Sequence, residues 1–486
     1  MSGHLITVHR VKVKRSPATG VWISMACLTF GTVAFATAPA DPGVRPGPTA
    51  AGGPLPGLTD TEQRPFWLGW ERFRQKHSVA GLNPGLGPAF NALSCAQCHA
   101  QPAAGGSSTN PDSPQVRRVV FEQQRLALDA QPNPQVALAS LHRVPGGDQT
   151  VPSFITPDGP IRVARFIRHP DGTPDGSVHP LYTVAGREDA PGCNLEPPDF
   201  SAEMAQGNLA FRVPSPAFGA GLIEAVPDSA LQANLRATQD QRRAFGIGGR
   251  FNRDDTGALT RFGWKAQGRN VRLFSAESQH IEIGITNSIF PDGGAQDAAA
   301  HQTGCLAAAA PAAAESVAAG SADLTRFVAF IRLSAPPAPS THTESELNGR
   351  VLFGQVGCNL CHSPSLQTGQ AHLQPMSHVT VAAYSDFALH HMGPALADHI
   401  SQGIASGDEF RTAPLWGLGQ RIFFLHDGRT SDLVQAIQAH ASSDEHCTQP
   451  LPDGEVCASE ANASIHAFEA LSADRKQALL DFLRSL

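Results

Sequence analysis

Two short segments of the chain carry two cysteines and one histidine in the same order and at the same spacing. They are Cys95-Ala-Gln-Cys98-His99 and Cys358-Asn-Leu-Cys361-His362. Two thiols three residues apart can add to the two vinyl groups of a haem, and the adjacent histidine then reaches the iron as its proximal ligand. With 9 cysteines and 20 histidines among 486 residues, about 0.007 such segments are expected by chance. The spacing therefore predicts two covalently bound haem c groups, with His99 and His362 as iron ligands.

A zinc ribbon and a thioredoxin-like redox pair are the alternative explanations for these cysteines. A zinc ribbon brings its two cysteine pairs closer together in the sequence than they are here. A redox pair needs a βαβ pattern, which is missing around both segments. The haem interpretation is therefore preferred.

The remaining cysteines suit a protein that folds in an oxidising compartment. Cys27 lies in an N-terminal apolar stretch, and its removal leaves an even number of cysteines. Cys447 and Cys457 bracket a short loop rich in proline, so we expect a local disulfide there. Cys193 and Cys305 would then pair with each other.

Residues 1–38 are typical of an export signal. Four basic residues precede an apolar stretch from Val21 to Phe35, and small residues at alternate positions near Ala36 offer cleavage sites. A transmembrane anchor is the alternative, but the stretch is short for a span of about 20 residues. We therefore expect a periplasmic protein with no membrane span after cleavage.

Composition limits the remaining possibilities. The length suggests two to three domains of about 150 residues each. The net charge is −7, and no basic run lies outside the N-terminus, so nucleic acid is not an expected partner. With 46 glycines and 39 prolines, long irregular connections are expected.

The elements around the two CxxCH segments recur in the same order. A helix is expected from residues 59–61 onwards and another from Thr343, where Glu346 completes a capping box. Within these helices, Gly69-Trp-Glu-Arg-Phe73 aligns with Gly349-Arg-Val-Leu-Phe353. Two further apolar helices, Leu324–Leu333 and Leu479–Leu486, would close the two units.

The predicted fold is mainly α, with two cytochrome c-like haem domains, the first with a large irregular, partly β insertion. The expected parts are a flexible leader at 39–57, a first domain at 58–335 with its insertion at 100–320, a linker at 336–342 and a second domain at 343–486. Strand-like pieces in the insertion are Val116–Phe121, Ile161–Ile167 and Val178–Val184. An alanine-rich stretch at Leu306–Ala319 is interpreted as a surface helix or loop.

Several longer segments carry a resemblance to the di-haem oxidoreductase family, which is similar to bacterial di-haem cytochrome c peroxidases and MauG-type enzymes. They are Leu86–Cys95, Pro214–Glu224, Arg261–Ala266, Phe410–Gly419 and Phe424–Arg429. The resemblance runs from about residue 60 to the C-terminus. It implies a peroxidase-like oxidoreductase with two haems.

The resemblance also implies site residues. Met392 is the candidate sixth ligand of the second haem, with Met376, His390 and His391 as competitors. For the first haem, Glu282 is the candidate catalytic carboxylate that moves a proton between the peroxide oxygens. An ordinary solvated or ion-paired glutamate is the alternative for Glu282, and the weaker candidates are Glu277 and His280.

Other residues have supporting roles by the same resemblance. Arg411 is expected to hold a haem propionate. Trp264 and Trp416 are candidates for an electron relay, with a core position as the alternative. Asp254 and Asp255 are a candidate calcium site, although a simple turn explains their spacing equally well.

The expected function is therefore that of an exported di-haem c-type cytochrome oxidoreductase. Electrons from a small redox protein or other donor would enter at the second haem, pass to the first and reduce hydrogen peroxide there. The alternatives are a pure electron-transfer cytochrome and a MauG-like oxidase that acts on a protein partner.

Overall fold

The computed structural model describes residues 38–47, 49–81, 83–108, 154–156, 159–291, 305, 323–442, 447, 451–452 and 454–486. Outside these ranges lie the expected export signal except for its last residue, the expected strand Val116–Phe121 and the alanine-rich stretch Leu306–Ala319. All described residues belong to one structural unit, residues 38–486. No helix in the described ranges has the length and apolarity that a membrane crossing requires.

The described part of the chain is mainly helical, with short strands. The helices are α1 (Asp60–Arg74), α4 (Phe200–Ala205), α5 (Ala220–Glu224), α6 (Asp228–Ala237), α7 (Gln239–Ala244), α8 (Val271–Ile283), α12 (Glu344–Gln355), α13 (Leu433–Gln438), α14 (Asn462–Glu469), α15 (Ala473–Ser485) and a helix over residues 323–333. The strands are β1 (Ala89–Phe90), β2 (Val163–Phe166), β3 (Val178–His179), β4 (Tyr182–Thr183), β5 (Leu209–Arg212), β6 (Leu366–Gln367), β7 (Thr380–Val381), β8 (Leu389–His391) and β9 (Glu409–Arg411). Short 3-10 turns are η1 (Cys95–Gln97), η2 (Cys358–Leu360), η3 (Gln374–Met376) and η4 (Leu418–Gln420).

Each CxxCH segment follows a helix that begins with a capping box. The Thr59 hydroxyl accepts a hydrogen bond from the Glu62 backbone N–H, and the Glu62 carboxylate accepts one from the Thr59 N–H. Thr343 and Glu346 make the same exchange at the start of α12. These reciprocal bonds satisfy backbone donors that a helix start leaves unpaired, so both helices begin at a defined residue.

The two helix pairs that frame the CxxCH segments cross at a glycine. A Cβ at Gly69 in α1 would lie 2.1 Å from a carbonyl oxygen of the 323–333 helix and 2.8 Å from the Phe330 Cβ. A Cβ at Gly349 in α12 would lie 1.9 Å from a carbonyl oxygen of α15 and 2.7 Å from the Phe482 Cβ. Only glycine permits this approach, and the correspondence supports the internal repeat expected from the sequence.

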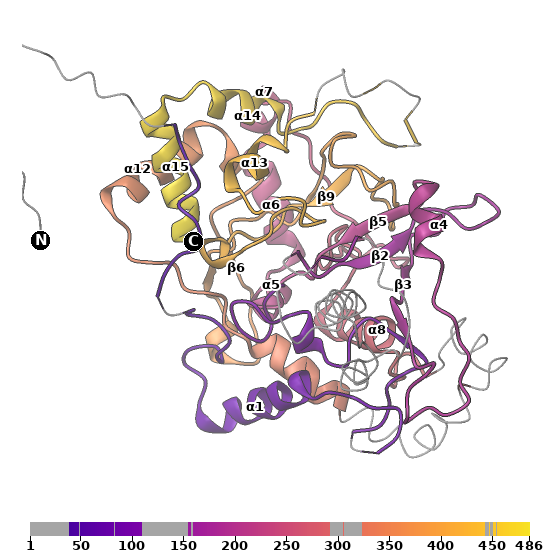
Figure 1. Cartoon of the computed structure of the whole chain (residues 1–486). Helices are drawn as coiled ribbons and strands as arrows, with labels where there is room; N and C mark the ends of the chain where they lie inside the picture. Colours follow the sequence, from indigo (N-terminus) through magenta and orange to yellow (C-terminus); the bar gives the residue numbers. More distant parts are fainter. Residues whose placement is uncertain are drawn as a thin grey trace, which may run out of the picture. The chain divides into compact units, whose positions relative to one another are not determined.

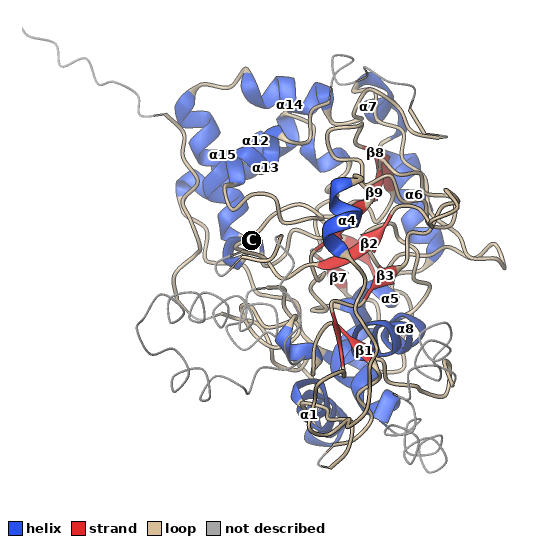
Figure 2. Ribbon diagram, turned by 45° about the vertical axis from the view of Figure 1, so that its right-hand side comes forward, coloured by secondary structure: helices blue, strands red, loops and turns tan. Residues whose placement is uncertain are grey.

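A small sheet lies between the two ends of the described body. Its antiparallel order is β3-β2-β5, with Arg165 opposite Val178 on one side and Ala210 on the other. In Figures 1 and 2, α12, α13, α14 and α15 gather at one end, α1 and α8 lie at the other, and α4 lies beside β2. The strands expected within Ile161–Ile167 and Val178–Val184 are thus confirmed.

Helix α8 has a defined start and a defined end. The Asn270 side chain accepts a hydrogen bond from the Leu273 N–H at its start. Gly284 ends it with φ +70°, and a Cβ there would lie 2.7 Å from the Gly87 Cα. Glycine at this left-handed position therefore fixes the end of α8, and with it the position of Glu282 in the last turn of the helix.

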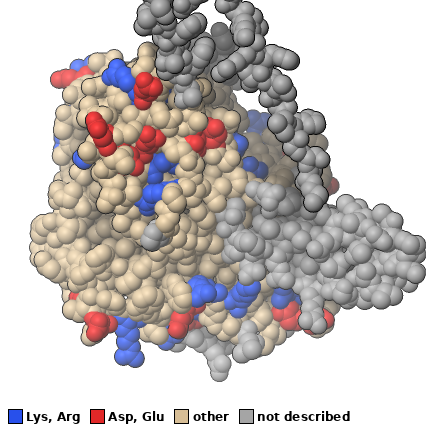
Figure 3. Space-filling model, turned by 60° about the vertical axis from the view of Figure 1, so that its left-hand side comes forward, with Lys and Arg blue, Asp and Glu red and all other residues tan. Residues whose placement is uncertain are grey.

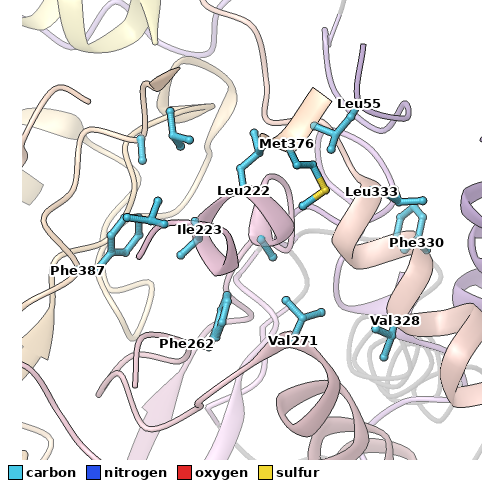
Figure 4. Packing of buried hydrophobic residues seen from close by; sticks show 14 of the residues in the cluster. Leu55, Leu222, Ile223, Phe262, Val271, Val328, Phe330, Leu333, Met376 and Phe387 are labelled. Atoms are coloured by element: carbon cyan, nitrogen blue, oxygen red, sulfur yellow. The ribbon is translucent and has the colours of Figure 1, made fainter. Parts of the chain in front are cut away.

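The largest apolar cluster joins segments from both expected domains. Leu55, Ile223 and Phe330 pack in it with Met376 and Phe387. Figure 4 shows the Met376 side chain among these apolar neighbours. On the surface drawn in Figure 3, acidic and basic side chains are interspersed. The domain division at 336–342 stays a prediction.

Both expected disulfides are present. Cys193 bonds to Cys305, and Cys447 bonds to Cys457. Cys193 and Cys305 are both buried in an apolar cluster with Phe90 and Tyr182. The Cys193–Cys305 disulfide therefore joins distant parts of the expected insertion within the apolar cluster against which Cys95 packs.

Residues 39–57, expected to be a flexible leader, make specific contacts with the C-terminal part of the chain. The Asp41 carboxylate accepts hydrogen bonds from the Arg484 guanidinium at 2.7 and 2.6 Å. Asp41 also accepts one from the backbone N–H of Leu433, the first residue of α13, at 2.9 Å. The Arg45 guanidinium donates to the carbonyl oxygens of Ser485 and Ala338.

Candidate functional site

Two cavities of similar volume each contain one CxxCH segment. The first cavity, of about 210 Å³, is lined by Cys95, Cys98 and His99 together with Glu282 and Arg165. The second cavity, of about 220 Å³, is lined by Cys358, Cys361 and His362 together with Met392 and His440. The structure therefore gathers the expected haem-attachment residues into two separate pockets.

The two CxxCH histidines are held in the same way. The Nδ1–H of His99 donates to the Gly106 carbonyl oxygen at 3.0 Å, and that of His362 donates to the Tyr384 carbonyl oxygen at 3.0 Å. Burial lowers the pKa of His99, and it lowers the pKa of His362 to about 4. Both rings are therefore neutral, and their Nε2 lone pairs are left for a metal, which is the usual arrangement of an iron-binding histidine.

A phenylalanine from each leading helix contacts the corresponding histidine ring. The ring centroids of Phe73 and His99 are 6.1 Å apart, and those of Phe353 and His362 are 6.4 Å apart. The same two phenylalanines pack on Phe330 and Phe482 of the closing helices. The glycine crossings therefore position both CxxCH histidines through one aromatic contact each.

The four CxxCH cysteines are the cysteines of the described ranges that form no disulfide. Burial raises the pKa of Cys95 and of Cys358 to about 12. Thiols with such pKa values stay protonated and are poor redox nucleophiles. This environment argues against a thiol–disulfide site and fits thiols reserved for covalent attachment.

Two arginines, the buried Arg411 and the half-buried Arg421, line both cavities. Burial lowers the pKa of each to about 10, yet neither forms an ion pair with a described residue. Arg411 donates from Nε to the Gly263 carbonyl oxygen at 2.8 Å, whereas Nη2 of Arg421 is buried with no hydrogen-bond partner. Guanidinium groups that line both cavities and lack carboxylate partners fit the propionates of haems. Arg421 was not expected from the sequence.

Trp264 forms part of the wall that the two cavities share. It is 9% exposed, and its Nε1–H donates to the Val213 carbonyl oxygen at 2.9 Å. The Arg421 guanidinium lies 5.9 Å from its ring centroid. Trp416, the other candidate relay residue, lines the first cavity only.

The candidate catalytic carboxylate, Glu282, lies in the first cavity near the end of α8. Its Oε2 accepts a hydrogen bond from Asn91 Nδ2 at 2.8 Å, and its backbone carbonyl accepts one from the Asn91 N–H at 2.8 Å. Burial raises the pKa of Glu282 above its ordinary value. A carboxyl group with a raised pKa beside a cavity can both take and return a proton.

The weaker candidates for the first haem lie elsewhere. Neither Glu277 nor His280 lines the first cavity, and the His280 ring stacks on Phe290 with centroids 5.5 Å apart. Among the described residues that line this cavity, His99 is the one histidine, and no methionine lines it.

The candidates for the sixth position of the second haem separate in the structure. Met376 is buried in the apolar core and lines neither cavity. His391 does not line the second cavity and pairs with Asp408. His390 lines it, but both ring nitrogens are engaged by carboxylates, at 2.6 and 3.1 Å. Met392 remains as a lining residue of the second cavity.

His440, just beyond α13, is a further candidate that sequence reasoning missed. Its Nδ1–H donates to the Ala436 carbonyl oxygen at 2.7 Å, and burial lowers its pKa. His440 and His362 both line the second cavity. His440 therefore has the same neutral ring with an available Nε2 as the proximal histidines. The signal is its spacing of seven residues from Leu433, which continues the buried face of α13 just past the end of that helix.

Asp254, one of the two residues of the candidate calcium site, makes the hydrogen bonds of a turn. Oδ1 of Asp254 accepts hydrogen bonds from Thr256 and Ala258, and Oδ2 pairs with Arg269 at 3.2 Å. Within the described ranges, no group of three or more His, Cys, Asp or Glu side chains is arranged to hold a metal ion.

Comparison with known proteins adds a family. The family model described as "Di-haem oxidoreductase, putative peroxidase" matches residues 165–486. No curated protein matches the chain.

Three solved structures are similar to parts of the chain. Hydrazine synthase of Kuenenia stuttgartiensis has 16% identity over 34% of this chain and 55% of that chain, with a TM-score of 0.21. The diheme peroxidase BthA of Burkholderia thailandensis has 16% identity over 46% of this chain and 65% of that chain, with a TM-score of 0.29. A MauG-like protein associated with microbial copper homeostasis has 18% identity over 54% of this chain and 90% of that chain, with a TM-score of 0.28. This chain thus spans less than two thirds of the first two proteins.

Proposed function

Because the chain belongs to the di-haem oxidoreductase family, we propose that it is an exported, periplasmic c-type cytochrome that reduces hydrogen peroxide. The two CxxCH segments would attach the haems, and residues 1–38 would direct export. A small redox protein is the proposed electron donor. Electrons would enter at the second cavity and be used at the first.

The observation that carries this proposal is the difference between the two cavities. The second cavity is lined by His390, His426, His440 and Met392 in addition to His362. The described residues around the first cavity offer no second histidine or methionine, but they include the buried carboxyl group of Glu282. One haem would therefore be saturated and suited to electron transfer, and the other would have a position for peroxide.

The haems, when bound, supply the electron transfer and the peroxide-binding iron, and the chain supplies the rest. His99 and His362 would hold and orient the irons, while Arg411 and Arg421 would pair with propionates. Glu282 takes a proton from one peroxide oxygen and returns it to the other. Trp264 is buried in the wall that the two cavities share.

We propose His440 rather than Met392 as the sixth ligand of the second haem. His440 has its Nδ1–H fixed by a backbone carbonyl and lines the second cavity together with His362. Met392 instead packs against Val213, Trp264 and Phe410. Electron paramagnetic resonance of His440→Ala should lose the low-spin signal, and that of Met392→Leu should keep it. The reverse result would restore Met392.

Electron paramagnetic resonance of the oxidised protein tests the proposed function. We expect one low-spin haem and one high-spin haem, and the high-spin signal should change on addition of peroxide. Glu282→Gln should keep both signals and lower peroxide turnover by about 10²–10⁴-fold, the contribution of a positioned acid–base group. Two low-spin signals that ignore peroxide would refute an enzyme and leave an electron carrier. Slow turnover with a long-lived oxidised state would indicate a MauG-like oxidase.

A further inference from the structure

Three arginines besides Arg411 line the first cavity, and they differ in how far their charge is neutralised. Arg212 is paired with the Asp398 carboxylate through Nε at 2.9 Å and Nη2 at 2.7 Å. Arg421 lies in the wall shared with the second cavity. Arg165 lines the first cavity only, and no carboxylate of a described residue lies within ion-pair distance of it.

The Arg165 side chain is half-buried, and its guanidinium leaves much of its hydrogen-bonding capacity unused. Nη1 donates to the Gly176 carbonyl oxygen, whereas Nε is buried and has no partner. A guanidinium carries five N–H donors and keeps its charge in proteins. An unpaired buried donor costs free energy, so its retention beside a cavity points to a ligand that satisfies it.

The backbone holds Arg165 rigidly toward the first cavity. Arg165 lies in the central strand β2 and is paired with Val178 in β3 and with Ala210 in β5. Side chains alternate along a strand, and Val163, two residues earlier, lines the same cavity. Ala164, between them, is fully buried on the opposite face. The orientation of Arg165 is therefore fixed by the sheet.

Glu282 lines the same cavity from α8 and is fixed from the other side. Asn91 holds its Oε2, and the Oδ1 of Asn91 is itself fixed by the Leu181 N–H at 2.9 Å. Oε1 of Glu282 makes no hydrogen bond with a described residue. The first cavity thus contains a rigid unpaired cation and a rigid carboxyl group with a vacant oxygen.

We propose that Arg165 and Glu282 together form the binding site for a small protic ligand that becomes an anion when it loses its proton, with hydroperoxide as the substrate of this class. Glu282 takes the proton of HOOH, and the Arg165 guanidinium binds the HOO⁻ that remains. Glu282 then returns the proton to the departing oxygen as the O–O bond breaks. With two electrons from the redox-protein donor and two protons from solvent, the products are two waters. This inference rests on the proposed function, because it assigns a substrate site within the proposed peroxidase.

Anion binding to the oxidised holoprotein tests this site without any turnover. Fluoride is titrated into the wild type, Arg165→Met and Arg168→Met, and binding is followed by the change in haem absorbance. Arg168 is an exposed arginine just beyond β2 and serves as the matched control. We expect Arg165→Met to weaken fluoride binding at least about tenfold, the effect of losing a charge-assisted hydrogen bond, and Arg168→Met to bind as the wild type does.

Carbon monoxide binding to the reduced protein separates a charge effect from structural damage. Carbon monoxide is neutral, so Arg165→Met should bind it with the wild-type affinity. If both ligands weaken in Arg165→Met, Arg165→Lys decides: because lysine keeps the positive charge, recovery of fluoride and carbon monoxide binding supports the site, and loss of both overturns it. Unchanged fluoride binding in Arg165→Met overturns the role of Arg165 and leaves the proposed function standing. A wild type that binds neither ligand has no open haem, which refutes the proposed function itself.

Discussion

Replacement of Gly349 by alanine tests the glycine crossing that positions the second proximal histidine. The added Cβ would lie 1.9 Å from the Ala478 carbonyl oxygen and 2.7 Å from the Phe482 Cβ. Ordinary carbon contacts are about 3.5–4.0 Å, so α12 and α15 would have to separate by more than roughly 1 Å. The obstacle is backbone, which cannot rotate away as a side chain can.

The expected cost follows from two opposing effects. Overpacking of a close contact costs about 1–3 kcal/mol, and a backbone obstacle places Gly349→Ala at the upper end. Alanine gains about 1 kcal/mol over glycine in helix propensity. The net loss of unfolding free energy should therefore be about 2 kcal/mol.

Gly354→Ala is the matched control in the same helix. Its Cβ would have no neighbour within 4 Å, so only the propensity gain applies and the variant should be as stable as the wild type or up to about 1 kcal/mol more stable. Urea unfolding, followed by circular dichroism and by haem absorbance, measures both variants. Equal stability of Gly349→Ala and Gly354→Ala would refute the crossing and, with it, the aromatic contact through which α12 and α15 position His362.

Three further outcomes follow from the structure. Arg421→Met should lower the midpoint potentials of both haems in a redox titration, because loss of a nearby cation favours the ferric state; a shift of one potential only would contradict its place in the shared wall. His399→Gln should destabilise the protein below about pH 6.5 and have little effect at high pH. The hydrogen bond to Glu455 raises the pKa of His399 above its ordinary 6.5, so the stabilisation disappears as pH rises through the folded-state pKa. Urea unfolding at several pH values measures this, and a pH-independent loss of stability would refute it. Replacement of both Cys193 and Cys305 by serine should lower the free energy of unfolding by up to about 5 kcal/mol, because their sequence separation is 112 residues; thermal unfolding unchanged from the wild type would contradict this.

Features with a local signal could be predicted from the sequence. The caps at Thr59 and Thr343 depend on residues three positions away, and the CxxCH spacing by itself predicts covalent haem attachment. The start of α15 has a weaker signal in the sequence. Its apolar run suggested Leu479, whereas the helix begins at Ala473, because its first turns are polar and hide the periodicity.

Features that depend on distant parts of the chain could not be predicted. Arg421 and Arg165 are of interest because no carboxylate of a described residue pairs with them. Only the folded chain shows which carboxylates lie near an arginine. His440 carries a local signal, its spacing of seven residues from the buried Leu433, but nothing in the sequence ties this position to His362. The proline-rich composition of the leader suggested flexibility, and its contact with Arg484 is invisible at the level of composition.

That contact has a consequence for the order in which the chain folds. The partners of Asp41 lie 392 and 443 residues further along the chain. At about 5–20 residues per second, synthesis separates Asp41 from Arg484 by roughly 20–90 s. The segment that emerges among the first must therefore wait, unpaired and open to proteases, until the last helix exists. Formation of the contact between Asp41 and Arg484 would be a late folding event. Sensitivity of residues 39–57 to proteolysis would report whether the C-terminal helix α15 has docked.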